Sequence, residues 1–167
     1  MRRTIATLIV ASGLAVAGCA GQPAKPQPTS PAKSSSAAPR QVMSFGEERV
    51  GKRGVITVGK PVAYDLPADP ARPKDLTRGL RFEFVVKNTS KQALQAAAFT
   101  LAPTVGGAPA ALVTDPAQNI GNKLSADVLP GAERKLGIVL AVPAKPAEVM
   151  VKVTFEGTNP LYWTGTV

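Results

Sequence analysis

Cys19 is the one cysteine in this 167-residue sequence, and the sequence contains no histidine. A cysteine thiol becomes a nucleophile when a neighbouring base activates it, and histidine is the commonest such base and the commonest metal ligand. A single cysteine also cannot form an intrachain disulfide. Most hydrolase mechanisms are therefore excluded, and we expect a protein that is not an enzyme and that needs no metal and no cofactor.

The residues before Cys19 have the order of a secretion signal. Arg2 and Arg3 provide a positive start, and an apolar run follows from residue 5 to residue 16. This run is shorter than the roughly twenty residues that cross a bilayer as a helix. We therefore expect residues 1–18 to be cleaved off as a signal peptide.

The segment Val16-Ala17-Gly18-Cys19 resembles the lipobox of bacterial lipoproteins. The resemblance implies that a diacylglycerol is attached to the Cys19 thiol and that cleavage leaves this cysteine first. Each buried methylene of an acyl chain adds about 0.8 kcal/mol of membrane affinity, so two or three chains make release slow. We expect a lipid-anchored protein on the extracytoplasmic face of the cell membrane. The alternatives are an ordinary signal peptide with a chance cysteine and an uncleaved apolar anchor.

Carboxylates are the remaining groups that could do acid–base or metal chemistry. Glu47 and Glu48 are adjacent, so in an extended chain they point to opposite sides. Asp65, Asp69 and Asp75 could gather around Ca²⁺, but their spacing fits no known calcium loop and basic residues lie among them. We expect these carboxylates to form turns and balance charge.

The net charge of +9 favours an anionic partner. Arg49, Lys52 and Arg53, together with Arg134 and Lys135, could form an anion-binding patch, although single basic residues on solvent faces are ordinary. Candidate partners are anionic lipid, an anionic wall polymer or an envelope protein. Nucleic acid is excluded because the chain is exported and has no basic helix or basic motif interleaved with aromatics.

Tyr162 and Trp163 are the one place where a large aromatic should face outward, because neighbours in a strand point to opposite faces. We expect Trp163 in the core and Tyr162 at the rim. Alternatively, Tyr162 is a binding platform for a sugar or a protein partner, since exposed aromatics are enriched at such sites.

Two regions of different composition must position these residues. Residues 20–44 hold five prolines and a triple serine with almost nothing to bury, which is the composition of a disordered tether. From Phe45 the pattern changes to short apolar alternations between turn residues. We therefore assign residues 19–44 to the lipidated cysteine and its linker, and residues 45–167 to one domain.

Alternation with a period of two predicts three long strands. Apolar positions share one face within residues 80–86, and residues 136–142 and 149–155 repeat the pattern as half-buried strands. Shorter strands are expected at 55–58, 61–64, 112–114 and 161–167. About seven to eight strands at this spacing predict an all-β, immunoglobulin-like sandwich of two antiparallel sheets.

Turn residues separate these strands. Leu129-Pro130-Gly131-Ala132 has the proline and glycine of a type II turn, with a positive φ at the glycine. Asn88 begins another turn, in which asparagine tolerates the left-handed conformation. Segment 92–99 has helix propensity but lies between strands, so we expect a strand with a β-bulge where its apolar parity shifts.

Four segments carry a resemblance to a known family. They are Gly54-Val55-Ile56-Thr57-Val58-Gly59, Arg81-Phe82-Glu83-Phe84-Val85-Val86-Lys87-Asn88-Thr89-Ser90, Leu129-Pro130-Gly131-Ala132-Glu133 and Val151-Lys152-Val153-Thr154-Phe155. In order and spacing they resemble the telokin-like, immunoglobulin-fold domain of unknown function of Gram-positive surface lipoproteins, including immunogenic mycobacterial antigens. The resemblance covers residues 45–167 and implies the fold but no particular ligand. The Ala-, Gly- and Pro-rich composition points to an actinobacterial source.

Together these features predict a membrane-anchored surface lipoprotein whose domain is a non-catalytic binding or interaction module. The alternative is a carrier of lipid or another small ligand in the cell envelope, which would need an apolar cavity between the sheets. An enzyme is the least expected class, because no other catalytic set of residues replaces the missing histidine.

Overall fold

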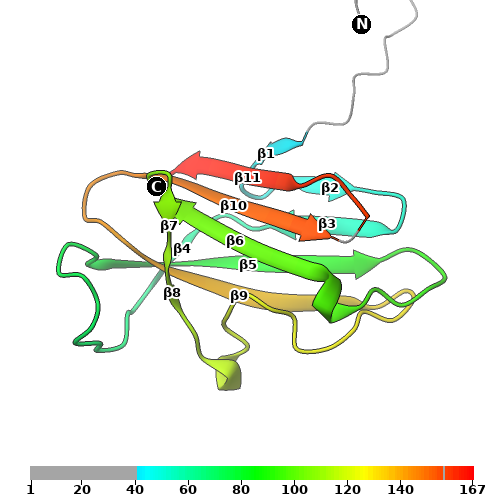
Figure 1. The fold of residues 1–167 in the computed structure, drawn as a ribbon, viewed down its shortest axis with the longest axis horizontal. Coiled ribbons are helices and arrows are strands. Elements are labelled where there is room, and N and C mark those ends of the chain that lie inside the picture. The colour runs from blue at the N-terminus through cyan, green and yellow to red at the C-terminus, as the bar shows by residue number, and fades with distance from the viewer. Residues whose placement is uncertain (1–40, 156) are drawn as a thin grey trace, which may run out of the picture. The chain divides into compact units, whose positions relative to one another are not determined.

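The computed structural model describes residues 41–155 and 157–167, which fold into two β-sheets (Figure 1). The predicted lipobox with Cys19, and the linker as far as residue 40, lie outside the described residues. Within the described part, no helix is long and apolar enough to cross a membrane.

One sheet contains five strands. Its order is β1 (Val42–Ser44), β11 (Leu161–Thr166), β10 (Glu148–Phe155), β6 (Phe99–Val105) and β7 (Ala108–Pro109). Neighbouring strands are antiparallel except β1 and β11, which run parallel, so the expectation of purely antiparallel sheets is wrong for this pair. The parallel pair arises because the chain runs beside the start of β11 and then crosses to the other sheet.

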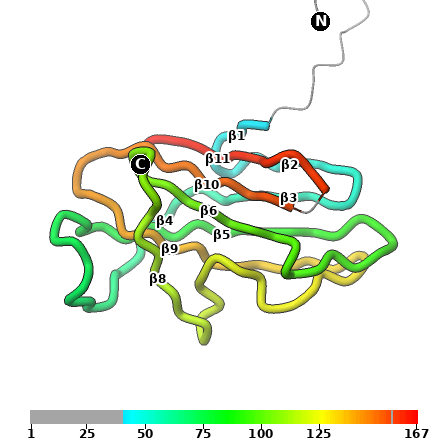
Figure 2. The backbone as a smooth tube through the Cα atoms, viewed as in Figure 1, coloured from blue at the N-terminus to red at the C-terminus, as the bar shows by residue number. Residues whose placement is uncertain are grey.

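The other sheet contains six strands. Its order is β2 (Glu48–Val50), β3 (Gly54–Val58), β5 (Arg78–Asn88), β9 (Glu133–Val142) and β8 (Ala111–Val113), with β4 (Val62–Tyr64) paired to β5. β3 and β4 follow one another along the same edge of β5 (Figure 2). A side chain at Gly79 of β5 would collide with the carbonyl oxygen of Tyr64, so glycine permits the close approach of β4.

The strand order is that of an immunoglobulin-like sandwich. In that fold one sheet has the order A-B-E-D and the other contains C, F and G as neighbours. β3, β5, β9 and β8 occupy the first set of positions, and β6, β10 and β11 occupy the second. The predicted all-β, immunoglobulin-like sandwich is confirmed, with β1, β2, β4 and β7 as short additions of two or three residues.

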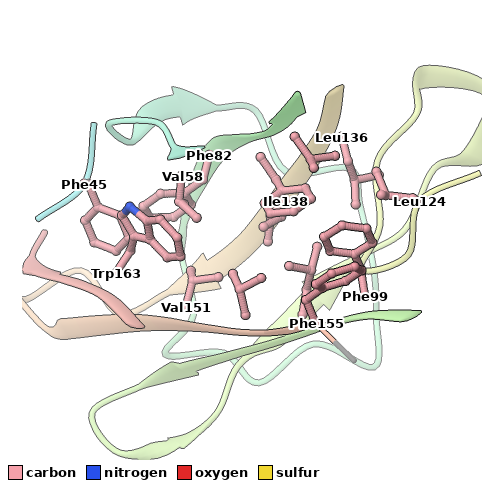
Figure 3. Packing of buried hydrophobic residues seen from close by; sticks show 14 of the residues in the cluster. Phe45, Val58, Phe82, Phe99, Leu124, Leu136, Ile138, Val151, Phe155 and Trp163 are labelled. Atoms are coloured by element: carbon pink, nitrogen blue, oxygen red, sulfur yellow. The ribbon is translucent and has the colours of Figure 1, made fainter. Parts of the chain in front are cut away.

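Alternate residues of both sheets face one another and form one core (Figure 3). On β5 the alternate positions Phe82, Phe84 and Val86 are buried and Leu80 is half-buried, and the alternate positions from Val149 to Phe155 on β10 are buried, as predicted. Trp163 of β11 is fully buried, also as predicted. Its Nε1 donates a hydrogen bond to the carbonyl oxygen of Glu47 at 2.9 Å, which satisfies the one polar atom of the indole.

β9 differs from the half-buried strand that we predicted. All its residues from Leu136 to Val142 are buried, including those that face away from the other sheet. At Gly137 the loop between β8 and β9 and the Arg81 side chain of β5 cover this outer face: a Cβ there would come within 3.2 Å of both Ile120 and the Arg81 guanidinium. Alternation therefore marks the inner face of β9, while loop packing buries the outer face.

Asn88, the last residue of β5, is the one buried polar residue in the described part of the chain. Its Nδ2 donates to the carbonyl oxygens of Gln92 (2.7 Å) and Val128 (2.8 Å). Its Oδ1 accepts from the backbone N and the hydroxyl of Ser90 (2.9 and 2.8 Å). The prediction of a left-handed Asn88 is wrong, because Asn119 is the only non-glycine residue with positive φ among those described. The structure instead uses the side chain of Asn88, whose amide makes these hydrogen bonds.

The turn before β9 forms as predicted and is attached to Asn88. Gly131 has a φ of +75°, and Ala132 N donates to the carbonyl oxygen of Leu129 at 3.0 Å. Gly131 N donates to the carbonyl oxygen of Asn88 (3.0 Å), and Asn88 N donates to that of Ala132 (2.9 Å). Main chain and side chain of Asn88 therefore both hold the segment that precedes β9.

Residues 92–98 do not form the bulged strand that we predicted. Leu94 makes an isolated β-bridge, and the chain then forms the 3-10 turn η1 (Ala96–Ala98) before β6 begins. The carboxylate of Asp127 accepts a hydrogen bond from Ala96 N at 2.8 Å. A partner distant in the sequence therefore fixes this conformation, which local propensity does not indicate.

The domain begins earlier in the chain than its composition indicates. Residues 42–44, which we assigned to the linker, form β1, and Met43 is buried in the core. Three residues are too few to show hydrophobic alternation. Both sheets and all core residues of the described part lie in the compact unit Ala37–Val167, which therefore has a core of its own.

Replacing Asn88 by alanine is expected to lower the free energy of unfolding by about 2–4 kcal/mol, because the carbonyl oxygens of Gln92 and Val128 each lose one hydrogen bond and Ser90 N loses its acceptor at a fully buried position. Urea unfolding measures the effect. Gln92→Ala is the matched control, since it removes an amide side chain from the same loop but keeps the carbonyl that Asn88 binds. Equal stability of the two variants would show that the hydrogen bonds of Asn88 contribute little.

Candidate ligand-binding cleft

A cleft of about 530 Å³ opens at one end of the sandwich. The β2–β3 hairpin, the loop after β5 and the turn between β10 and β11 lie at this end (Figure 1). Residues of both sheets line the cleft, so it is an opening between the sheets and not a groove on one of them.

The cleft exists because β1 and β2 belong to different sheets. β1 pairs with β11 and β2 pairs with β3, while residues 45–47 connect the two strands. The connection is held closed by the buried ring of Phe45 and by the hydrogen bond from Trp163 to Glu47. From this closed point the strands diverge, towards Gln41 on one side and Gly51 on the other, and both of these residues line the cleft.

The floor of the cleft is apolar. Val86, Leu94, Phe99 and Phe155 are buried core residues that also line the cleft, and the half-buried Leu161 flanks them. The rings of Phe99 and Phe155 are stacked with their centroids 4.6 Å apart (Figure 3). An apolar group in the cleft would therefore contact the same residues that form this end of the core.

Three cations, Arg49, Lys52 and Arg53, line the cleft with this floor. The guanidinium carbon of Arg53 lies 5.2 Å from the centre of the Phe155 ring, and its Nη2 donates to the carbonyl oxygen of Ala93 at 3.3 Å. The Nε of Arg49 is buried, and in the described part of the chain it is the one buried side-chain polar atom that has no hydrogen-bond partner.

No carboxylate of the described residues lies within 4.0 Å of these three cations. The two ion pairs found in the described part of the chain both involve Lys135, with Glu83 at 3.2 Å and Glu133 at 3.9 Å. Glu156, next to Phe155 in the sequence, lies outside the described residues. Charges interact more strongly beside an apolar surface than in bulk water, so an anionic group would be stabilised here.

The structure brings Arg49, Lys52 and Arg53 together, as the anion-binding hypothesis requires. Arg134 and Lys135, which the sequence placed in the same patch, are not among the residues that line the cleft. Lys135 instead pairs with carboxylates of its own sheet.

Tyr162 does not line the cleft, although its neighbour Leu161 does. Tyr162 is half-buried and lies opposite Val42 and Lys152 within its sheet. Its role as a binding platform stays a prediction, as does lipidation of Cys19. In the described part of the chain, no group of three or more His, Cys, Asp or Glu residues is placed to hold a metal ion.

Sequence reasoning did not find the apolar floor. Leu94, Phe99 and Phe155 have the pattern of core residues and are buried as such, and only the divergence of two short strands places the cleft beside them. The one local signal is the run Gly157-Thr158-Asn159, which follows β10, has small side chains and lines the cleft.

No family model matches this sequence, and no curated protein matches it. Among solved structures, a Bacillus subtilis protein described as a candidate lipoprotein (ycdA) aligns over 72% of this chain with 17% identity and a TM-score of 0.52. The alignment covers 38% of that protein. An uncharacterised β-sandwich protein from Clostridium difficile aligns over 74% of this chain and 93% of its own, with 15% identity and a TM-score of 0.47. The alignment with the Bacillus subtilis protein shows a shared fold and nothing more.

Gly54→Ala is expected to lower the free energy of unfolding by about 1–3 kcal/mol, because the added methyl group would collide with the carbonyl oxygen of Lys87. Gly51→Ala is the matched control in the same hairpin, since its Cβ would meet nothing closer than the carbonyl oxygen of Gly54 at 3.5 Å. Urea unfolding of both variants measures the difference. If Gly54→Ala proved as stable as Gly51→Ala, β3 and β5 could not approach as closely here as described.

Proposed function

We propose that this protein is a membrane-anchored, non-catalytic binding module of the cell envelope, and that the cleft is where it binds a small ligand. One observation carries the proposal: three cations without a carboxylate partner among the described residues line an opening whose floor is apolar. Small-molecule sites are typically concave, about 300–1,000 Å³ in volume and mostly apolar, with a few polar groups that fix orientation.

The geometry favours a small ligand over a protein partner as the occupant of the cleft. A protein partner would need a surface to lie against, whereas the apolar atoms here are reached through an opening between two sheets. The ionisable side chains of the described lining are Lys and Arg, which suit the binding of an anion.

The anchor rests on the sequence around Cys19. The fold likeness to a candidate lipoprotein of Bacillus subtilis is compatible with it. Lipid on Cys19 would hold the chain at the extracytoplasmic face of the membrane and leave the domain free to meet ligands in the envelope. A module that releases its ligand again would act as a carrier.

Cys19→Ala is expected to move the protein from the membrane fraction to the soluble extracytoplasmic fraction, because the acyl chains have no acceptor. Immunoblots of fractionated cells and incorporation of labelled palmitate measure this. Ser12→Ala within the apolar run is the control and should leave both readouts unchanged. A Cys19→Ala protein that stays in the membrane and keeps its label would contradict the lipid anchor.

Ile56→Trp is expected to block the cleft, because Ile56 of β3 lines it and a larger side chain would fill the opening. The uncharged dye N-phenyl-1-naphthylamine should rise in fluorescence when it binds to the domain of residues 37–167. Ile56→Trp should lower the affinity of the domain for this dye at least tenfold. Val62→Trp, at an exposed position of β4 outside the cleft, is the matched control. Absence of dye binding to the unchanged domain would argue against a small-ligand cleft.

A further inference from the structure

We propose that the cleft selects an anionic amphiphile: a carboxylate- or phosphate-bearing group joined to one apolar chain, taken up as a single molecule. The apolar chain would lie along the half-buried lining residues Ile56 and Leu161, beside the buried aromatic pair, and Arg49, Lys52 and Arg53 would hold the charged group. This inference rests on the proposed function and assigns the chemical class of the ligand.

Arg53 joins the two halves of the site. Its guanidinium lies over the ring of Phe155, at 5.2 Å, and Phe155 is stacked on Phe99. A cation placed against an aromatic ring keeps its hydrogen-bond donors free at the edge of the guanidinium plane. One of these donors is used by the carbonyl oxygen of Ala93, in a long bond of 3.3 Å. The remaining donors are available to a carboxylate or phosphate lying above the aromatic floor.

Arg49 provides an independent indication of an anionic oxygen. Its Nη1 donates to the carbonyl oxygen of Val50 at 2.7 Å, whereas its Nε is buried and has no acceptor among the described residues. Buried donors in native proteins are nearly always satisfied by protein, water or ligand. A carboxylate or phosphate accepts from two nitrogens of one guanidinium at once, so an anion in the cleft would satisfy this atom once the Arg49 side chain turns its Nε outward.

The floor excludes a simple inorganic anion as the whole ligand. Phosphate alone would be held by the cations and would leave the half-buried apolar lining residues Ile56 and Leu161 exposed to water in the cleft. Conversely, an uncharged apolar molecule would leave three neighbouring cations without a counter-charge. Only a molecule with both properties contacts the floor and the cations together.

Calorimetric titration of the domain of residues 37–167 with three probes below their micelle concentrations tests the proposal. The probes are dodecyl phosphate, the uncharged dodecyl maltoside and inorganic phosphate. We expect the Kd of dodecyl phosphate to be at least tenfold lower than that of dodecyl maltoside, and no detectable binding of inorganic phosphate at millimolar concentration. Addition of 0.5 M salt should weaken the binding of dodecyl phosphate by roughly tenfold, since salt screens its charge, and should leave the binding of dodecyl maltoside unchanged.

Charge variants locate the effect. Arg53→Gln and Arg49→Gln should each raise the Kd of dodecyl phosphate several-fold while leaving that of dodecyl maltoside unchanged. Arg134→Gln removes the same charge from an exposed position outside the cleft and should change neither. Thermal unfolding of each variant checks that it is folded, and the uncharged naphthylamine dye checks that its cleft is intact.

The outcomes separate this inference from the proposed function. Equal affinity for dodecyl phosphate and dodecyl maltoside would overturn the anionic selectivity but leave the cleft as a ligand site. Failure of both amphiphiles and of the naphthylamine dye would overturn the proposed function as well. Binding to phosphatidylglycerol vesicles without binding of monomeric dodecyl phosphate would mean that the cations contact a membrane surface, and it would overturn uptake of a single molecule.

Discussion

The buried carboxamide of Asn88 links three parts of the chain that are distant in the sequence. It joins the end of β5 to the loop that follows, and joins both to the segment before β9. Leu94 lies between these attachments and forms its β-bridge with Val128, whose carbonyl oxygen Asn88 also binds. Because Leu94 belongs to the floor of the cleft, the shape of that floor depends on a polar group set within an apolar core. Satisfying every polar atom there leaves one arrangement of the loop favoured over others.

The cleft follows from the way the chain changes sheets at its start. β1 extends one sheet and β2 the other, so the two strands must separate. The hydrogen bond from Trp163 Nε1 to the carbonyl oxygen of Glu47 fixes the point at which they begin to separate. In a sandwich whose first strands stayed within one sheet, this edge could close over the aromatic floor. Here the same residues, Phe99 and Phe155, complete the core from one side and face the opening from the other.

The sequence predicts those parts of the structure that depend on local pattern. Alternation identifies β5 and β10, and the Pro-Gly pair identifies the turn at Gly131, because side-chain periodicity and backbone preference are properties of neighbouring residues. Sequence-based prediction fails where a residue distant in the chain determines the conformation. At η1 the carboxylate of Asp127 accepts a hydrogen bond from Ala96 N. At Asn88 the side-chain amide makes the decisive hydrogen bonds, whereas the sequence suggested that its backbone conformation mattered. The candidate site divides in the same way. Clustered cations are visible in the sequence at Arg49, Lys52 and Arg53, whereas their apolar floor comes from strands far along the chain.

The parallel pairing of β1 with β11 also has a mechanical meaning. A chain held by its N-terminal side would transmit tension into the described domain through Gln41 and then β1. Since β1 and β11 run in the same direction, pulling the start of β1 against the far end of β11 loads their hydrogen bonds in shear, all at once, and does not open them one after another. A three-residue strand at the edge of the sheet would thus resist mechanical unfolding. The hydrogen bond from Tyr162 N to the carbonyl oxygen of Gln41, just before this strand, lies beside the cleft.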